Sequence, residues 1–327
     1  MNTMEIFSPS DYIAALVRDV EHAKRRVILF SHILGCDAST TELIDALCAA
    51  AERGVRVEVA SDVFTYSIMG GWRTTPIKAD GRIRALREMA KKFKRSGVTF
   101  HWIGQLGPIL FAGRMHIKWG VIDDKVYCFG GINLYEEGLQ YADYMFGGRD
   151  TKLGDRIVSE HERIVRANRL GKTHNSYHFS SLYGTVLVDG GKMGDSIIYT
   201  HACELAREAQ AITFVSQYCP TGKLGKIMQA KEAKLYFSHW RLARGFNRFL
   251  IRASMAFTGY HTLYQRQTFI HAKCIIYTMR DGRKVALTGT HNFVRGGVAL
   301  GTREIALETS DPHIVAQLEE FLAKHIY

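Results

Sequence analysis

The sequence predicts an α/β protein in which two similar halves follow one another along the chain. In the first half, helical and extended patterns alternate, an order typical of a sheet covered by helices. The expected elements are a helix near residues 11–25, a strand from Val27, a helix over 41–53 and a strand from Val55. The same order returns after residue 195, and one unusual motif occurs once in each half.

The second half repeats the pattern of the first. Its expected elements are a helix over 195–210, a strand from Ala211, a helix over 224–232 and a strand from Lys234. The segments AKRRVILFSHI and AREAQAITFVSQY, from Ala23 and Ala206, both run from a helix end into an apolar strand. We interpret this likeness as an internal duplication.

A polar segment separates the two halves. A helix expected over 155–170 is followed by GKTHNSYHFSS, whose composition is typical of a linker or crossing segment. We therefore expect a boundary near residue 175, with an N-terminal domain of residues 1–175 and a C-terminal domain of residues 176–327.

The size and charge of the chain limit its class. With 327 residues, 46% of them hydrophobic, it can bury a substantial core, which argues against disorder. Its 43 basic and 32 acidic side chains leave a net charge of +11. Such an excess attracts phosphates, nucleic acid or anionic lipid surfaces, but it does not choose among them.

The cysteines and the hydropathy pattern favour a cytoplasmic protein. The six cysteines are scattered without C-x-x-C or metal-type spacing, so the sequence predicts neither a zinc site nor a disulfide framework. A signal peptide and a membrane span are both disfavoured, because no basic start leads into an apolar run and no apolar stretch approaches roughly 18 residues. Any membrane contact is expected to be peripheral, on the inner membrane face.

The most informative segment is MHIKWGVIDDKVYCFGGIN, with the spacing H-x-K-x4-D-x6-G-G-x-N. Strand alternation would place His116 and Lys118 on one face, while Ile117 and Trp119 point into the core. An imidazole then lies beside an ammonium group. The glycine pair, Gly131 included, lets backbone approach a phosphate, and Asn133 and Lys118 can donate to its oxygens.

A second copy, HAKCIIYTMRDGRKVALTGTHN, begins 155 residues after the first. It supplies the same groups in the same order, with a threonine at the aspartate position: His271, Lys273, Thr278, Gly289, Thr290 and Asn292. A single histidine on a strand is more often structural than catalytic, but two matched copies favour a shared site. Four groups would then neutralise and hold a phosphodiester without a metal: Lys118, Lys273, Asn133 and Asn292.

These paired motifs resemble those of the phospholipase D superfamily, and the resemblance covers nearly the whole chain. It implies a two-lobed α/β/α sandwich with pseudo-twofold symmetry, in which both histidines meet around one phosphate. The family chemistry is a two-step displacement that uses neither metal nor cofactor. His116, in the intact motif, would form a phosphohistidine, and His271 would protonate the leaving alcohol and deprotonate the incoming one. The opposite assignment stays open.

The resemblance also assigns supporting residues. Each histidine needs a carboxylate on its other ring nitrogen, and the family places acidic residues shortly after each asparagine. Asp143 and Glu304 occupy these positions. The motif aspartate, Asp123, is expected to support its loop. Thr278 departs from the family pattern, which widens the range of substrates to consider.

The segments around the first motif look like cardiolipin synthase and related phosphatidyltransferases, so we expect a phospholipid substrate. Apolar segments from Phe64 and from Leu106 flank the proposed site, and they suit either acyl chains or a buried core. Two basic, amphipathic helices, from Arg82 and from Arg241, suit either an anionic bilayer surface or a solvated face.

Two other functions compete with this interpretation. A nuclease or nucleic-acid phosphodiesterase of the same superfamily would use the same net charge to bind the phosphate backbone. A phosphate-binding protein without activity would retain the scaffold alone. Because one chain carries both motifs, we expect a monomer. The choice between hydrolysis and transfer depends on which acceptor enters the pocket.

Overall fold

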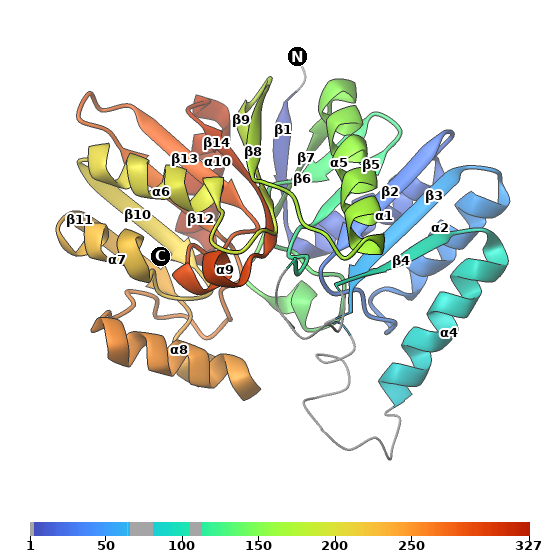
Figure 1. The fold of residues 1–327 in the computed structure, drawn as a ribbon, viewed down its shortest axis with the longest axis horizontal. Helices are drawn as coiled ribbons and strands as arrows, with labels where there is room; N and C mark the ends of the chain where they lie inside the picture. The colour runs from blue at the N-terminus through green and yellow to red at the C-terminus, as the bar shows by residue number, and fades with distance from the viewer. Residues whose placement is uncertain (1–2, 64, 66–80, 105–112) are drawn as a thin grey trace.

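The computed structural model describes residues 3–63, 65, 81–104 and 113–327. The two apolar segments that flank the site, 64–72 and 106–111, therefore lie almost wholly outside the described residues. The chain forms two mixed seven-stranded sheets that lie side by side (Figure 1). This confirms the predicted α/β fold with two lobes.

The first sheet contains the strands of the first half. Its strands, in spatial order, are β1 (Met4–Phe7), β7 (Met145–Arg149), β6 (Lys125–Cys128), β5 (Trp119–Ile122), β2 (Arg26–Ser31), β3 (Arg56–Asp62) and β4 (Thr99–Ile103). Strands β2, β3 and β4 are parallel, and the other pairs are antiparallel.

The second sheet repeats this order. Its strands are β11 (Glu232–Phe237), β10 (Ala211–Ser216), β12 (Cys274–Thr278), β13 (Lys284–Gly289), β14 (Arg303–Thr309), β9 (Gly184–Gly190) and β8 (Tyr177–Ser181). The run β3-β2-β5-β6-β7-β1 corresponds to β11-β10-β12-β13-β14-β9, and in both runs only the first pair is parallel. The predicted internal duplication is therefore present in the topology.

Helices cover both faces of each sheet. The outer helices of the first lobe are α1 (Pro9–Glu21), α2 (Thr41–Glu52) and α4 (Gly81–Ser96), and those of the second lobe are α6 (Ile197–Glu208) and α7 (Gly222–Gln229). Between the sheets lie α5 (Thr151–Arg169) and α10 (Pro312–His325), whose apolar faces share one core with both sheets. Two further helices, α8 (Gly245–Thr258) and the short α9 (Arg295–Leu300), follow β11 and β13.

Local sequence explains the elements that carry the site. In β2, Val27 and Leu29 pack against the outer helices, whereas Ile28 and Phe30 face the central core. Because both faces are covered, the strand reads as a continuous apolar run. Helix α5 begins at Asp150, whose carboxylate accepts the backbone N–H of Leu153.

One sequence prediction is wrong in part. Residues 171–181 were expected to be a linker, but Tyr177–Ser181 forms β8, the edge strand of the second sheet. The strand alternates half-buried and exposed side chains, and an edge strand with one solvated face requires few apolar residues. Its polar composition therefore hides it. The boundary expected near residue 175 stays a prediction.

Candidate active site

The two H-x-K segments lie at equivalent places in the two lobes. His116 and Lys118 come just before β5, and His271 and Lys273 come just before β12. The histidines were expected within strands, but both lie just outside them. The residue before each histidine forms an isolated β-bridge with the other lobe. Ile117 and Trp119 are fully buried in the central core, as the alternation predicts.

Backbone hydrogen bonds connect each H-x-K segment to the opposite lobe. Met115 forms a bridge with Arg303, and the N–H of His116 donates to the Arg303 carbonyl at 2.9 Å. In the same way Ala142 bridges Ile270, and the N–H of His271 donates to the Ala142 carbonyl at 3.0 Å. Both histidines are therefore held where the lobes meet.

Each histidine is paired with a carboxylate from the other half of the chain. Nδ1 of His116 lies 2.9 Å from Oε2 of Glu304, and Nδ1 of His271 lies 2.6 Å from Oδ2 of Asp143. A carboxylate at Nδ1 favours the tautomer that carries its proton there and leaves Nε2 for chemistry. We call the six residues that meet here the seam site: His116, Lys118, Asp143, His271, Lys273 and Glu304.

The two lysines are buried beside their histidines. Nζ of Lys118 donates to the carbonyl of His116 at 2.6 Å, and Nζ of Lys273 donates to the carbonyl of His271. Burial, then the charge of Lys273, lowers the pKa of Lys118 to about 7. Burial also lowers the pKa of Lys273 to about 8, against the opposing effect of Asp143 and Glu304. Both ammonium groups are thus easily deprotonated above neutral pH.

Both seam histidines are neutral in the free protein. Burial, then the charges of the two lysines, lowers the pKa of His116 well below 6.5. Burial and Lys273 lower the pKa of His271 to about 4, although Asp143 raises it. A neutral imidazole with a free Nε2 can act as nucleophile or base. A bound phosphate anion would favour the protonated form of either ring.

Gly131 and Thr290, predicted to bind phosphate, contact the carboxylates of Asp143 and Glu304. They occupy equivalent positions in the two halves. A side chain at Gly131 would come within 2.7 Å of both carboxylate oxygens of Asp143, so only glycine leaves room for that group. Thr290 donates its hydroxyl to Oε2 of Glu304 at 2.5 Å. Their contacts therefore hold the carboxylates that orient the histidines.

The two motif asparagines are also at the lobe contact. Asn133 is buried, and its Oδ1 accepts the backbone N–H of Ile33 at 3.3 Å. Oδ1 of Asn292 is buried and has no hydrogen-bond partner among the described residues. That these amides bind a phosphate stays a prediction.

Asp123 and Thr278 lie at the far ends of β5 and β12 from the seam site. The Asp123 carboxylate accepts the backbone N–H groups of Lys24, Arg25 and Arg26 at 2.8–3.1 Å. It holds the entry to β2, the supporting role expected for it. In the second half, the backbone carbonyl of Thr278 accepts the N–H of Gln210 at 2.8 Å.

One residue of the site escaped the sequence prediction. The ring of His32 packs edge-on against the ring of His116, with centroids 4.9 Å apart, and its Nδ1 lies 2.6 Å from the Met115 carbonyl. Burial, then the neighbouring His116, lowers the pKa of His32 well below 6.5. The internal duplication could have indicated this residue. Aligning VILFSHI with AITFVSQY places His32 opposite Gln217, so both halves have a polar residue just after this strand, and Gln217 is buried.

A methyl group at Gly131 should disable the His271–Asp143 pair. It would lie 2.7 Å from the Asp143 oxygens and 2.8 Å from the His271 carbonyl, so we expect Gly131→Ala to displace the carboxylate. Turnover of a generic aryl phosphodiester should fall by about 10–100-fold. Gly296→Ala is the matched control, because its methyl would meet nothing within 4 Å. Equal turnover in the two folded variants would contradict the assigned contact.

The lysines should make anion binding depend on pH. Their depressed pKa values mean that positive charge is present below about 7 and is lost as pH rises through about 7 and 8. We expect affinity for tungstate, a dianion throughout this range, to fall by about tenfold per pH unit above these values at constant ionic strength. Calorimetric titration measures it, and affinity unchanged up to about pH 9 would show that the lysines do not hold the anion.

Comparison with known proteins bears on the family and the fold. Residues 16–161, which include the first motif and Asp143, match the family described as "Cardiolipin synthase, PLD-like domain". No curated protein matches the chain. Phosphatidylserine synthase of Haemophilus influenzae Rd KW20 is similar over 99% of this chain and 86% of its own, with a TM-score of 0.72 and 14% identity.

A second solved structure shares the fold. Polyphosphate kinase from Porphyromonas gingivalis is similar over 98% of this chain, with a TM-score of 0.62 and 12% identity, and this chain spans 46% of its length. At such identities these likenesses concern the fold. The matched family model covers residues 16–161, less than half of the 327-residue chain, so the likeness to a cardiolipin synthase PLD-like domain concerns the first half and includes only the first of the two motifs.

Proposed function

We propose that this protein cleaves a phospholipid phosphodiester at the seam site and passes the phosphatidyl group to water or to an alcohol. The observation that carries the proposal is the pair of crossed contacts between His116 and Glu304 and between His271 and Asp143. They place two imidazoles with matched orientation at one lobe contact, beside two lysines. Two displacements at one phosphorus need this set of groups.

In the first step, Nε2 of His116 attacks phosphorus, and the bond from phosphorus to the leaving oxygen breaks. His271 gives its Nε2 proton to that oxygen, so the alcohol leaves neutral. In the second step, His271 takes a proton from the acceptor, whose oxygen attacks phosphorus, and the phosphorus–nitrogen bond breaks. The ammonium groups of Lys118 and Lys273 neutralise the charge that collects on the phosphoryl oxygens.

The pKa values bear on both roles without deciding which histidine takes which. A nucleophile must be unprotonated, and the pKa of His116 is held well below 6.5. The acid must carry a proton, yet the pKa of His271 is only about 4 in the free protein. A bound phosphodiester adds a negative charge beside the ring and raises that pKa. Protonation of His271 would thus accompany substrate binding.

Helix α8 supports a lipid substrate. Phe249 and Phe257 are eight residues apart on one stripe of the helix, with 65% and 93% of their surfaces exposed. The guanidinium groups of Arg248 and Arg252 lie 5.2 Å from the ring of Trp240. An outward apolar stripe beside a basic row suits the interface of an anionic bilayer, where the rings enter and the arginines meet head groups.

Helix α4, the other basic helix, lies at the same lower edge of the molecule as α8 in Figure 1. Two basic helices on one edge, one in each lobe, could contact a flat anionic surface together. In the described part of the chain, every helix is too short or too polar to cross a bilayer. The proposed membrane contact is therefore peripheral.

The substrate and the roles of the histidines can be tested together. Pure protein in chelator is incubated with phosphatidylglycerol vesicles and, separately, with single- and double-stranded DNA. We expect release of glycerol or formation of cardiolipin, and a loss of roughly 10²–10⁴-fold or more in His116→Ala. His178→Ala, at an exposed position on β8, serves as the control. Cutting of DNA alone would replace the lipid assignment with the nuclease alternative.

A covalent trap separates the two assignments of the histidines. With a labelled substrate that has a good leaving group, His271→Ala should still form the phosphohistidine and then stall. His116→Ala should form none. The opposite pattern would exchange the roles of the two rings, and no trapped label in either variant would exclude the covalent mechanism.

Exposed phenylalanine on α8 should be required for vesicle binding. Burying one phenylalanine side chain contributes about 1.5–3 kcal/mol, so we expect Phe257→Ser to weaken binding to phosphatidylglycerol vesicles by about 10–100-fold. Co-sedimentation measures it. Leu182→Ser is the control, because Leu182 is 69% exposed but lies between β8 and β9, at the opposite edge in Figure 1. Equal binding by both variants would remove α8 from the membrane contact.

A further inference from the structure

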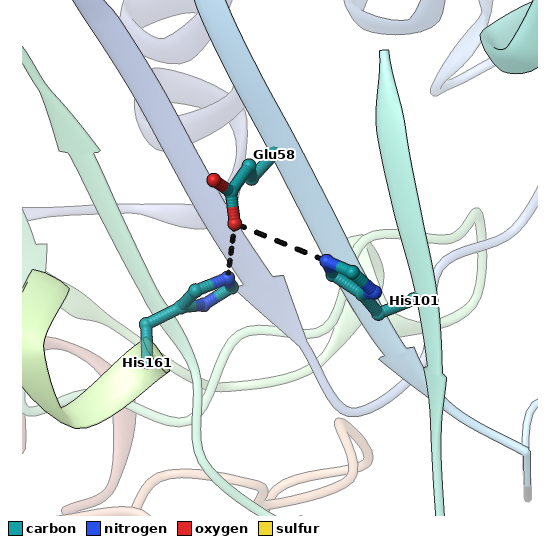
Figure 2. Close-up of side chains that lie close together, drawn as sticks. All are labelled: Glu58, His101 and His161. Carbon is teal, nitrogen blue, oxygen red and sulfur yellow. Dashed lines mark ion pairs between the residues drawn. The ribbon is translucent and has the colours of Figure 1, made fainter. Parts of the chain in front are cut away.

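A second group of titratable side chains converges outside the seam site. Glu58 on β3, His101 on β4 and His161 on α5 point toward one another (Figure 2). Nε2 of His161 lies 3.3 Å from Oε2 of Glu58, and Nε2 of His101 lies 3.9 Å from the same oxygen. One donor atom from each residue lies within 4.8 Å of the others.

The topology of the first lobe brings these residues together. Strands β3 and β4 are parallel, with Glu58 opposite Thr99 and Ala60 opposite His101. Glu58 and His101 are therefore diagonal neighbours on one face of the sheet. Helix α5 covers this face, and His161 belongs to its buried stripe.

His161 is an unusual residue for a core. Its side chain is fully buried, and among the described residues neither ring nitrogen makes a well-aligned hydrogen bond, although Nε2 lies 3.3 Å from Glu58. Burial of an imidazole whose hydrogen bonds are incomplete is unfavourable, so such a group calls for an explanation. A cation bound at Nε2 would satisfy it, and the ring already points toward Glu58 (Figure 2).

Arg56 orients the carboxylate of this group. Its Nε donates to Oε1 of Glu58 at 2.8 Å, and its Nη2 lies 2.8 Å from Glu162. Because Arg56 holds Oε1, the other oxygen is left facing the two histidines. Ligands of metal sites are commonly fixed by outer contacts of this kind.

We propose that Glu58, His101 and His161 bind one divalent transition metal ion, with Zn²⁺ as the favoured ion. Two imidazole nitrogens and one carboxylate oxygen are zinc ligands, whereas Ca²⁺ and Mg²⁺ prefer oxygen alone. With bonds of about 2.0–2.1 Å, ligand atoms of a tetrahedral site lie about 3.3 Å apart. The contact between Glu58 and His161 already has this length, and His101 needs only a small approach.

The fourth position of the site would be open to water. The side chains of Glu58 and His101 remain 17% and 14% exposed, so the ion has a path from solvent. The ion would fasten β3, β4 and α5 together. The ion would not touch the reacting groups. Glu58 lies four residues before Asp62 on β3, and Asp62 is the residue near the seam site: its carboxylate binds Arg114 and the N–H of Met115, next to His116.

The linear sequence could not reveal this group. Its three ligands come from positions 58, 101 and 161, without the short spacing of familiar metal motifs. From the sequence, no metal is expected. The seam site contributes none of the three ligands, so the two proposals can fail independently.

The metal itself is the probe. Untagged protein is stripped with chelator, dialysed, and titrated with ZnCl₂ by calorimetry and with CoCl₂ by visible absorption. We expect one Zn²⁺ per chain, the d–d bands of four-coordinate Co²⁺, and a rise of about 5 °C or more in Tm at saturating Zn²⁺.

Matched variants assign the site. Glu58→Gln and His101→Gln should each weaken Zn²⁺ binding at least tenfold, and His178→Gln, at an exposed histidine of the same protein, should leave it unchanged. The Tm of each metal-free variant shows whether it is folded. If one of the two variants fails to fold, the other still tests the site. Absence of stoichiometric binding, or binding that neither substitution weakens, would overturn the proposal. In that case the group is a structural contact between Glu58 and the two histidines.

Discussion

Each seam histidine shares a hydrogen bond with a carboxylate from the other half of the chain, and the rest of the site depends on this exchange. Asp143 and Glu304 are almost fully buried. A buried carboxylate that loses a hydrogen-bond donor is destabilising, by about 1–3 kcal/mol or more. Each acid accepts one hydrogen bond within its own half, from the N–H of Tyr144 or the hydroxyl of Thr290, but its histidine comes from the other half. The lobes must therefore associate before either imidazole is oriented. Folding and assembly of the site are therefore one event.

The duplication makes this exchange symmetrical. Because β5 and β12 occupy equivalent places in the two sheets, each half presents one histidine, one lysine and one acid at the same edge. A single core that includes α5, α10 and both sheets then fixes the distance between the halves. Gln317 of α10 adds to this by exchanging hydrogen bonds with the backbone of β1. The packing of this shared core therefore sets the positions of the site residues.

Repetition explains what the sequence could predict. The repetition identifies His116 and His271 and the order of helices and strands along the chain, because each copy supports the other. Residues without a repeated pattern were missed or misread. His32 has a different residue at its counterpart, and β8 resembles a linker because it is a polar edge strand. Strand register and helix packing, which linear spacing does not encode, decide both.

In the seam site, buried groups that can carry positive charge repel one another, and a bound anion would offset this repulsion. Burial lowers the pKa of Lys118, Lys273 and His271 together, and the positive charges oppose one another. The two carboxylates offset only part of this repulsion. A phosphodiester would supply the missing negative charge between the lobes and stabilise every protonated group at once. Its binding would therefore be coupled to proton uptake, and under the proposed mechanism the proton taken up at His271 would be the one that the leaving alcohol requires.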